Sequence, residues 1–386
     1  MYYMHIVTRV VVVLVLAGAS WWSVKLARAD AAFRKQTAED VAHAVELAPR
    51  DTAYLMAHAI QTEYDGGVPT PILERVAQLN PTSSAPRIRL GLAAEIRGDT
   101  AAAERWLQEA AHVDRQFETR WTLANFYFRQ GRAEEFWTWI RSALEISYAD
   151  RRLAFDLCRR MSTDDREILT RAIPERRGVV ADYLSYLIQK REVTALAPVA
   201  MKLATGHTSE DLPLLYVAAD TLIYGGDTQR AGELWEALGF GRPAGVFNPD
   251  FAALPSGHGF DWRFFAQPGV THANLDLPSG HRIRLNGQQP ESAELLRQVV
   301  GGLTAGKSYT LRWEARTQGF ADPTGLEWRI AGARAMVAAS ENWSGAEVGF
   351  TADSDRAVLV LAYRRPEGLV RAEGGLDLRR VVAVQP

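Results

Sequence analysis

The spacing of apolar residues changes once along this 386-residue chain, after Leu238. From residue 31 to about residue 238, apolar residues recur every three or four positions, which is typical of helices. Beyond that point, short runs alternate apolar and polar residues between glycines and prolines, which is typical of strands with one buried face. The segment "GFGRPAGVFNPD" separates the two patterns. The chain is therefore predicted to fold as a helical domain followed by an all-β domain.

The helical region contains an internal repeat. The stretches "RIRLGLAAEIRGDTAAAERWLQEAAHVD" and "WTLANFYFRQGRAEEFWTWIRSALEI" share the order helix, tight turn, helix, and their turn glycines Gly98 and Gly131 are 33 residues apart. A further copy turns at Gly226. Small residues at fixed places, such as Gly91 and Ala124, let paired helices approach closely.

This unit resembles the tetratricopeptide repeat over residues 37–238, or about six helix pairs at the family's repeat length. Residues 150–213 keep the helical pattern without the motif. The resemblance implies an α-solenoid whose groove binds a protein partner. Trp137 and Trp139 of the helical region are two residues apart and cannot share a helix face, so one of them is expected at the surface. The candidate partner-binding residues are Trp121, Tyr127, Trp137 and Trp139.

The C-terminal region is predicted to form an antiparallel sandwich of the jelly-roll type, with eight or nine strands in about 140 residues. Arginines alternate with apolar residues along these strands, which places one face of each strand in water. The alternating arginines are Arg282, Arg284, Arg312, Arg329 and Arg379.

The order of these strands and the segment "FNPDFAALPSGHGFDWRF" resemble carbohydrate-binding modules, which implies a glycan ligand. Trp343, in the loop-like "ASENWSGAE", is the main candidate for stacking on a sugar ring, with Trp262 and Tyr363 as further candidates. Trp313 and Trp328 alternate with the apolar set and are expected in the core.

The segment "FNPDFAALPSGHGFDWRFF" could also suggest an active-site loop, because it holds His258 and Asp261. Neither residue has a second ligand or catalytic partner at a useful spacing. The segment is instead predicted to be a hinge followed by the first strands of the sandwich, with Phe251, Phe260 and Trp262 starting the core.

Residues 6–24 carry a single charge, Arg9, and would span about 28 Å as a helix at about 1.5 Å per residue. Trp21 and Trp22 lie where interfacial aromatic residues are common. An uncleaved membrane anchor is expected; a signal peptide cut after the Ala27–Ala29 segment is the alternative. Basic residues after the span favour a cytoplasmic location for the rest of the chain. The family resemblance of the whole chain instead points to the periplasm.

An N-terminal anchor, tetratricopeptide-like repeats and a sandwich together resemble bacterial envelope proteins associated with exopolysaccharide production. The resemblance implies a single-pass protein of the inner membrane with its body in the periplasm. The net charge of −2 offers no long-range attraction for nucleic acid. The single cysteine, Cys158, cannot form an internal disulfide, and no phosphate or dinucleotide motif is present, so no cofactor or metal is expected.

The predicted domains are an anchor (1–29), an α-solenoid (30–240), a linker (241–250) and a jelly-roll-like sandwich (251–386). The predicted function is a non-enzymatic, membrane-anchored scaffold that recruits a protein through its repeats and binds a glycan through its sandwich, in envelope polysaccharide assembly. Two alternatives remain open. One is a glycan hydrolase or lyase with two carboxylates about 5–10 Å apart in the sandwich. The other is a structural sandwich that only caps the solenoid.

Overall fold

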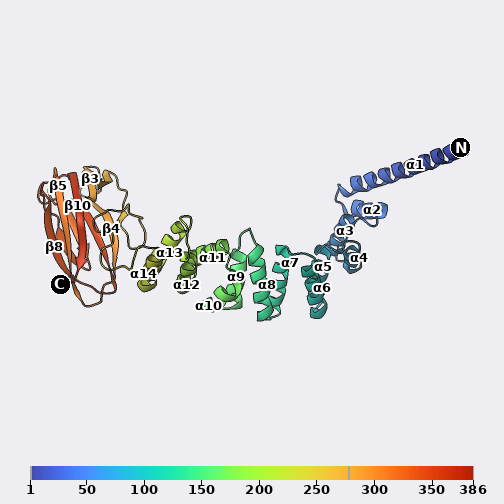
Figure 1. Ribbon diagram of the computed structural model, residues 1–386, viewed down its shortest axis with the longest axis horizontal. Helices are drawn as coiled ribbons and strands as arrows, with labels where there is room; N and C mark the ends of the chain where they lie inside the picture. The colour runs from blue at the N-terminus through green and yellow to red at the C-terminus, as the bar shows by residue number, and fades with distance from the viewer. Residues whose placement is uncertain (1, 277–278, 386) are drawn as a thin grey trace. The chain divides into compact units, whose positions relative to one another are not determined.

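The computed structural model describes residues 2–276 and 279–385, with side chains from residue 6 onward. Helices come first and strands last, as predicted (Figure 1). The chain divides into two compact units. The first comprises residues up to Thr163 with Thr170–Pro174, and the second comprises Asp164–Leu169 with Glu175–Pro386. The second unit therefore holds the last helices as well as the sandwich.

The first unit begins with the long helix α1 (Tyr2–Phe33), which contains the apolar segment predicted to span a membrane. Its residues Ile6–Phe33 are long and apolar enough to cross a bilayer, a property that signal sequences share. The last turns of α1 contact α2, and there Ala29 and Ala32 are buried. The ring of Phe33 lies 4.6 Å from that of Tyr54 on α3. The apolar helix thus continues without a break into the helical array.

The array of the first unit consists of short helices joined by tight turns (Figure 1). They are α2 (Ala38–Leu47), α3 (Thr52–Tyr64), α4 (Thr70–Leu79), α5 (Ala85–Ile96), α6 (Thr100–Val113), α7 (Phe117–Arg129), α8 (Ala133–Ile146) and α9 (Arg152–Met161). The short α10 (Asp165–Glu167) and the π-helical turn Ile168–Ala172 follow, within the segment that lacks the repeat motif. The assignment of the chain to the first or the second unit changes within this stretch.

The repeat motif has a clear physical basis in the pair α5–α6. Gly98 ends α5 with φ = 81°, a left-handed conformation that favours glycine. Asp99 follows it and caps α6 by accepting a hydrogen bond from the backbone N–H of Ala102. A Cβ at Gly91 would lie 2.6 Å from the buried Leu107 side chain, which confirms that this glycine permits close packing of the two helices.

The helices of the second unit are α11 (Arg177–Lys190), α12 (Val193–Ala204), α13 (Leu212–Tyr224) and α14 (Thr228–Ala237). The pair α13–α14 repeats the glycine-aspartate turn: Gly226 has φ = 91°, and Asp227 caps α14 through the N–H of Arg230.

The strands of the second unit form two five-stranded antiparallel sheets. Sheet A has the order β1-β4-β9-β6-β7, and sheet B has the order β2-β3-β10-β5-β8. The strands are β1 (Arg263–Phe264), β2 (Val270–Asp276), β3 (Ser279–Asn286), β4 (Ser292–Gly301), β5 (Ser308–Gln318), β6 (Leu326–Ile330), β7 (Ala333–Met336), β8 (Ser344–Thr351), β9 (Arg356–Arg364) and β10 (Glu373–Val384). The eight strands β3–β10 alternate between the sheets except at the hairpin β6–β7, which lies within sheet A. The resulting orders β3-β10-β5-β8 and β4-β9-β6-β7 are those of a jelly roll, so the predicted fold class is confirmed.

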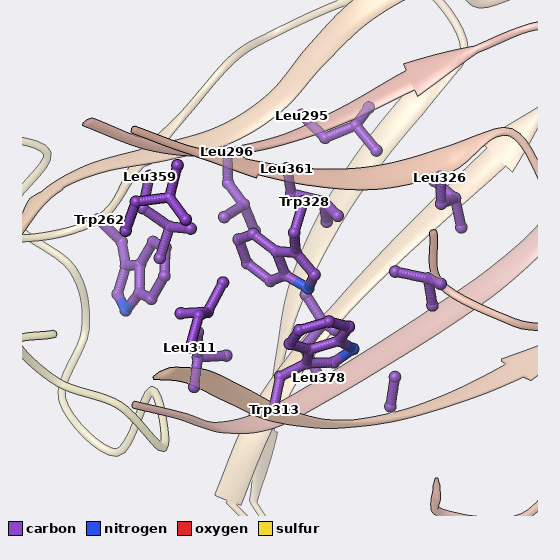
Figure 2. Packing of buried hydrophobic residues seen from close by; sticks show 14 of the residues in the cluster. Trp262, Leu295, Leu296, Leu311, Trp313, Leu326, Trp328, Leu359, Leu361 and Leu378 are labelled. Atoms are coloured by element: carbon purple, nitrogen blue, oxygen red, sulfur yellow. The ribbon is translucent and has the colours of Figure 1, made fainter. Parts of the chain in front are cut away.

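The core of the sandwich lies between the two sheets (Figure 2). Trp262, Trp313 and Trp328 are at most 2 % exposed and lie among leucines from both sheets. Phe251 belongs to this core, as predicted. Phe260 is buried too, but against Trp235 of α14 rather than in the core between the sheets. The structure corrects one detail: the segment before Arg263 forms turns and bends, with one isolated bridge at Gly245, and regular strand pairing begins only at β1.

The segment predicted to be a linker is fixed to both of its neighbours within the second unit. The rings of Phe240 and Phe247 pack against Trp235 of α14. The ring of Phe260, further along the loop, packs against the same tryptophan. The side chain of Gln298 on β4 accepts a hydrogen bond from the N–H of Phe247 and donates one to its carbonyl. The sandwich therefore packs directly on the last helix pair.

Candidate functional site

The outer face of sheet B carries a dense set of charged side chains. Along β5, buried residues alternate with accessible ones, so that Arg312, Glu314 and Arg316 point away from the core. The neighbouring strands contribute in the same way because antiparallel pairing aligns residues that point to the same face. We call this surface the arginine face; it consists of Arg282, Arg284, Arg312, Arg316, Arg379, Arg380, Asp377, Glu314, Glu347 and Trp343.

Asp377 lies at the centre of the arginine face, on β10. It pairs in register with Arg282 on β3 and with Arg316 on β5. Arg282 donates from Nε to Oδ1 at 2.6 Å and from an Nη to Oδ2 at 2.8 Å, and Arg316 donates from Nε to Oδ2 at 2.7 Å. Burial alone would raise the pKa of Asp377, but the hydrogen bonds from the two guanidinium groups outweigh it and hold this pKa below its usual range.

A second carboxylate on this face is held by two arginines in the same manner. Glu314 accepts from Nε of Arg379 at 2.5 Å and from Nη1 of Arg380 at 2.7 Å. The pKa of Glu314 is lowered, because the two guanidinium groups outweigh the effect of burial. Both arginines reach Glu314 because β10 has an irregular register between Arg379 and Val382.

Trp343 lies beside these charges, directly before β8. Its neighbour Ser344 pairs with Ala315, which places Trp343 at the level of Arg316. The guanidinium carbons of Arg316 and Arg379 lie 5.0 Å and 4.2 Å from the centre of the indole ring. Such cation–π contacts fix the orientation of the ring. Trp343 is half-buried and does not belong to the core, so the predicted exposed aromatic lies on the outer face of sheet B.

A hollow of about 390 Å³ opens on this face. Gly345 contributes to it, since a Cβ built on Gly345 meets nothing within 4 Å. The hollow is lined by Arg312, Trp313, Glu314, Gly345, Ala346, Glu347, Arg380 and Val382. The arginine face thus combines a flat aromatic ring, fixed hydrogen-bonding groups and space for a ligand.

The structure corrects the prediction for the other two glycan candidates. Trp262 is fully buried in the core (Figure 2). It stacks on Phe251 at 4.9 Å and donates from Nε1 to the carbonyl of Asn248. Tyr363 is also fully buried, and its hydroxyl accepts from the N–H of Ala372. Neither ring offers a free face to a ligand.

The four aromatic residues predicted to bind a protein fall into two groups. Tyr127 and Trp137 are at most 2 % exposed, so the structure corrects their assignment to a binding surface and places them in the core of the array. Trp121 and Trp139 are half-buried. Trp121 stacks on the partly exposed Phe117 at 6.0 Å. Of the pair Trp137 and Trp139, the latter is the surface residue.

His258 and Asp261 have partners that their spacing did not suggest. His258 is bound by Asp220 of α13, and Asp261 accepts hydrogen bonds from the N–H groups of Ser256 and Trp262. Burial raises the pKa of Asp261. Among the described residues, no group of three or more potential ligands is placed to hold a metal ion.

Five charged residues of the arginine face were not recognised from the sequence: Glu314, Arg316, Glu347, Asp377 and Arg380. The signal was present in "LRWEART" and "LDLRRVV", where charged residues occupy every second position. Alternation assigns those side chains to the outer face, but it does not say which strands lie side by side. That information depends on the long-range pairing of β10 with β3 and β5.

No protein-family model matches this sequence, and no curated protein matches it either. Similar solved structures fall into two groups. The carbohydrate-binding module TmCBM61, in complex with β-1,4-galactotriose, shares 12 % identity, covers 37 % of this chain and 99 % of its own, and gives a TM-score of 0.26. PilF of Pseudomonas aeruginosa shares 16 % identity, covers 49 % and 92 % of the two chains, and gives 0.28. YrrB, a TPR protein with an unusual peptide-binding site, shares 10 % identity, covers 52 % and 92 %, and gives 0.28.

The chain's own elements define its class: an all-α array of repeated helix pairs followed by an antiparallel jelly-roll sandwich, with one long apolar helix at the N-terminus.

Proposed function

We propose that this protein is a non-enzymatic, membrane-anchored scaffold whose sandwich binds a glycan on the arginine face. The observation that carries the proposal is the indole of Trp343, held by two guanidinium groups beside a hollow with charged walls. A flat aromatic ring stacks on the C–H face of a sugar, and charged groups around it bond to the sugar's polar substituents.

An enzyme that cleaves glycans fits this face less well. Glycoside hydrolysis requires one carboxyl group that stays protonated as the acid and a second that acts as base or nucleophile. Glu314 and Asp377 both have lowered pKa values, because each is bound by two arginines. Neither can supply a proton near neutral pH. Their environments lower both pKa values, whereas catalysis needs one carboxyl group with a raised pKa and one with a low pKa.

Capping of the helical array is a second role of the sandwich, favoured by its packing on Trp235 of α14. This role does not compete with ligand binding. The contacts with the helices come from the loop before β1 and from sheet A, through Arg263 and Arg356, whereas the arginine face belongs to sheet B.

The helical repeats would recruit a protein partner. Trp121 and Trp139 are accessible aromatic residues of the first unit. Phe117, which stacks on Trp121, extends this apolar surface along α7. Such side chains contribute most where they are buried by a partner.

The N-terminal helix would remain attached as an anchor. The predicted cleavage segment Ala27–Ala29 lies inside α1, and Ala29 is fully buried where α1 packs on the array. Cleavage there would remove a residue of the packed region. Lys25 lies 5.5 Å and 5.3 Å from the rings of Trp21 and Trp22, an arrangement suited to the headgroup region of a bilayer. Assembly of an envelope polysaccharide, with the body in the periplasm, is the setting that this architecture suits.

Affinity electrophoresis of the full chain in detergent, in gels that contain different polysaccharides, tests glycan binding. Trp343→Ala should raise the polysaccharide concentration that is needed for half-maximal retardation at least tenfold. Phe265→Ala is the matched control, since Phe265 is also half-buried and lies under an arginine, Arg297 at 5.6 Å, but belongs to the loop after β1 in sheet A. Absence of retardation by any neutral or acidic polymer would refute the proposal.

A further inference from the structure

The charges of the arginine face are unbalanced. By its definition the arginine face holds six arginines against three carboxylates, which leaves an excess of three positive charges. Counting Glu373, which points the same way at the start of β10, the excess is still two. The whole chain has a net charge of −2, so positive charge is concentrated on this surface.

Two of the three carboxylates of this face, Asp377 and Glu314, have little capacity left to accept hydrogen bonds from a ligand. Asp377 and Glu314 each accept from two guanidinium groups, and Asp377 is only 3 % exposed. Glu347 accepts from Arg312 at 2.9 Å and is 61 % exposed, so it is the carboxylate of this face that can still accept from a ligand. A neutral sugar is normally bound by acceptors as well as donors, because each hydroxyl group is both.

Donors, in contrast, remain available. Among the hydrogen bonds between described residues, Arg312, Arg316 and Arg379 each donate from Nε alone, so their terminal nitrogens are free to bind a ligand. The side chains of Arg312 and Arg380 are 59 % and 64 % exposed. Paired terminal nitrogens match the two oxygens of a carboxylate.

The position of Trp343 relates these donors to a stacked sugar. The guanidinium groups of Arg316 and Arg379 lie over the indole ring, so a pyranose ring would stack on the opposite face. The exposed Arg312 and Arg380 line the hollow on the same face of the sheet and provide the donors for the edge of that sugar. In a uronic acid the carboxylate is attached at the edge of the ring. A stacked uronate therefore brings its negative charge to the free donors, whereas a neutral sugar leaves the excess positive charge uncompensated.

From these observations we infer that the arginine face selects an acidic polysaccharide, one whose sugars carry carboxylates. This inference rests on the proposed glycan binding and specifies the class of glycan. Arg312 and Arg380 are the exposed donors for the carboxylate of the ligand, and Trp343 provides the stacking surface.

The experiment compares two polymers with the same backbone, polygalacturonate and its fully amidated form, in affinity electrophoresis with the full chain in detergent. The acidic polymer should bind at least tenfold more tightly than the amidated one. The double variant Arg312→Gln/Arg380→Gln should weaken binding of the acidic polymer about tenfold and weaken binding of the amidated polymer much less, so that the preference for the acidic polymer is lost.

The matched control is Arg334→Gln/Arg364→Gln, which removes the same charge from exposed positions in sheet A. It should bind the acidic polymer like the wild type. Equal binding of the two polymers, with loss on Trp343→Ala, would overturn the acidic preference and leave glycan binding intact. An equal loss in the two double variants would also overturn it, since the attraction would then depend on total charge rather than on this face. No binding to any polysaccharide would instead overturn glycan binding itself.

Discussion

The carboxylate of Asp220 on α13 binds Nδ1 of His258 at 2.7 Å, although 38 residues separate them. The same carboxylate accepts a hydrogen bond from the N–H of Gly259 at 2.7 Å and one from Arg263 at the start of β1. Tyr216 of α13 stacks on the imidazole of His258 at 5.6 Å. One helical side chain thus holds the loop before β1 and the first strand of the sandwich.

Replacing Asp220 should destabilise the second unit. Asp220→Ala leaves the largely buried Arg263 without its partner, so the free energy of unfolding should fall by about 2–3 kcal/mol. Urea unfolding followed by tryptophan fluorescence measures the loss. Glu236→Ala, at an exposed position of α14, should change stability by less than about 0.5 kcal/mol. A loss no larger than in this control would contradict a fastening role for Asp220.

Mild acid should destabilise the sandwich through two histidines. Burial, together with the neighbouring His272, lowers the pKa of His281 to about 3, and burial also lowers the pKa of His272. The unfolded chain binds protons at an ordinary histidine pKa of about 6.5, so the unfolded state gains protons first as the pH falls. Stability is therefore complete above that value and declines below it, by up to about 1.4 kcal/mol per pH unit for His281 and with a further loss from His272.

Urea unfolding at pH 7, 6 and 5 checks this dependence. His281→Gln cannot be protonated and should reduce the slope between pH 6 and pH 5 by about 1 kcal/mol per pH unit. An unchanged slope in this variant would mean that other groups control the acid sensitivity.

Trp262 and Trp343 should respond differently to truncation. Trp262→Ala creates a cavity between the sheets and should cost about 3–5 kcal/mol of stability. Trp343→Ala removes a half-buried ring from the surface and should cost less than about 1 kcal/mol. Thermal unfolding of both variants makes the comparison. Similar losses would contradict the division into a core residue and a surface residue.

Gly91 should not tolerate a larger residue. Gly91→Ala places a Cβ 2.6 Å from Leu107 and 3.2 Å from the carbonyl oxygen of Ala103, so the first unit should lose about 1–3 kcal/mol. Gly178→Ala, in α11, meets nothing within 4 Å and should be neutral or stabilising by up to about 1 kcal/mol. Equal effects of the two substitutions, measured by chemical denaturation, would show that close packing at Gly91 is not limiting.

The N-terminal helix should stay on the mature chain. Mass spectrometry of the chain extracted from membranes should detect residues before Ala27, because Ala29 is buried inside the packed part of α1. A control in which a cleavable signal sequence replaces residues 1–36 should be recovered without its leader. Recovery of the natural chain with an N-terminus at residue 30 would disprove retention of the anchor.

The fold could be predicted from local signals, but most of the site could not. Glycine-aspartate turns at Gly98 and Gly226 and alternation along β5 are short-range patterns, so the repeats and the sandwich follow from them. Burial of Trp262 depends on contacts with Phe251 and Trp328 that alternation alone does not reveal. The cluster around Asp377 requires the pairing of three strands. Arg316 lies 61 positions and Arg282 lies 95 positions from Asp377 in the sequence.

The unbroken course of α1 constrains how this protein can vary. An α-helix turns by about 100° and advances by about 1.5 Å per residue. Inserting one residue between Trp22 and Ala29 would therefore rotate the tryptophans and the whole apolar segment relative to the packed face of the helix. Substitutions in this stretch keep the helical phase, whereas insertions and deletions change it. The length of the segment should accordingly be fixed more strictly than its sequence.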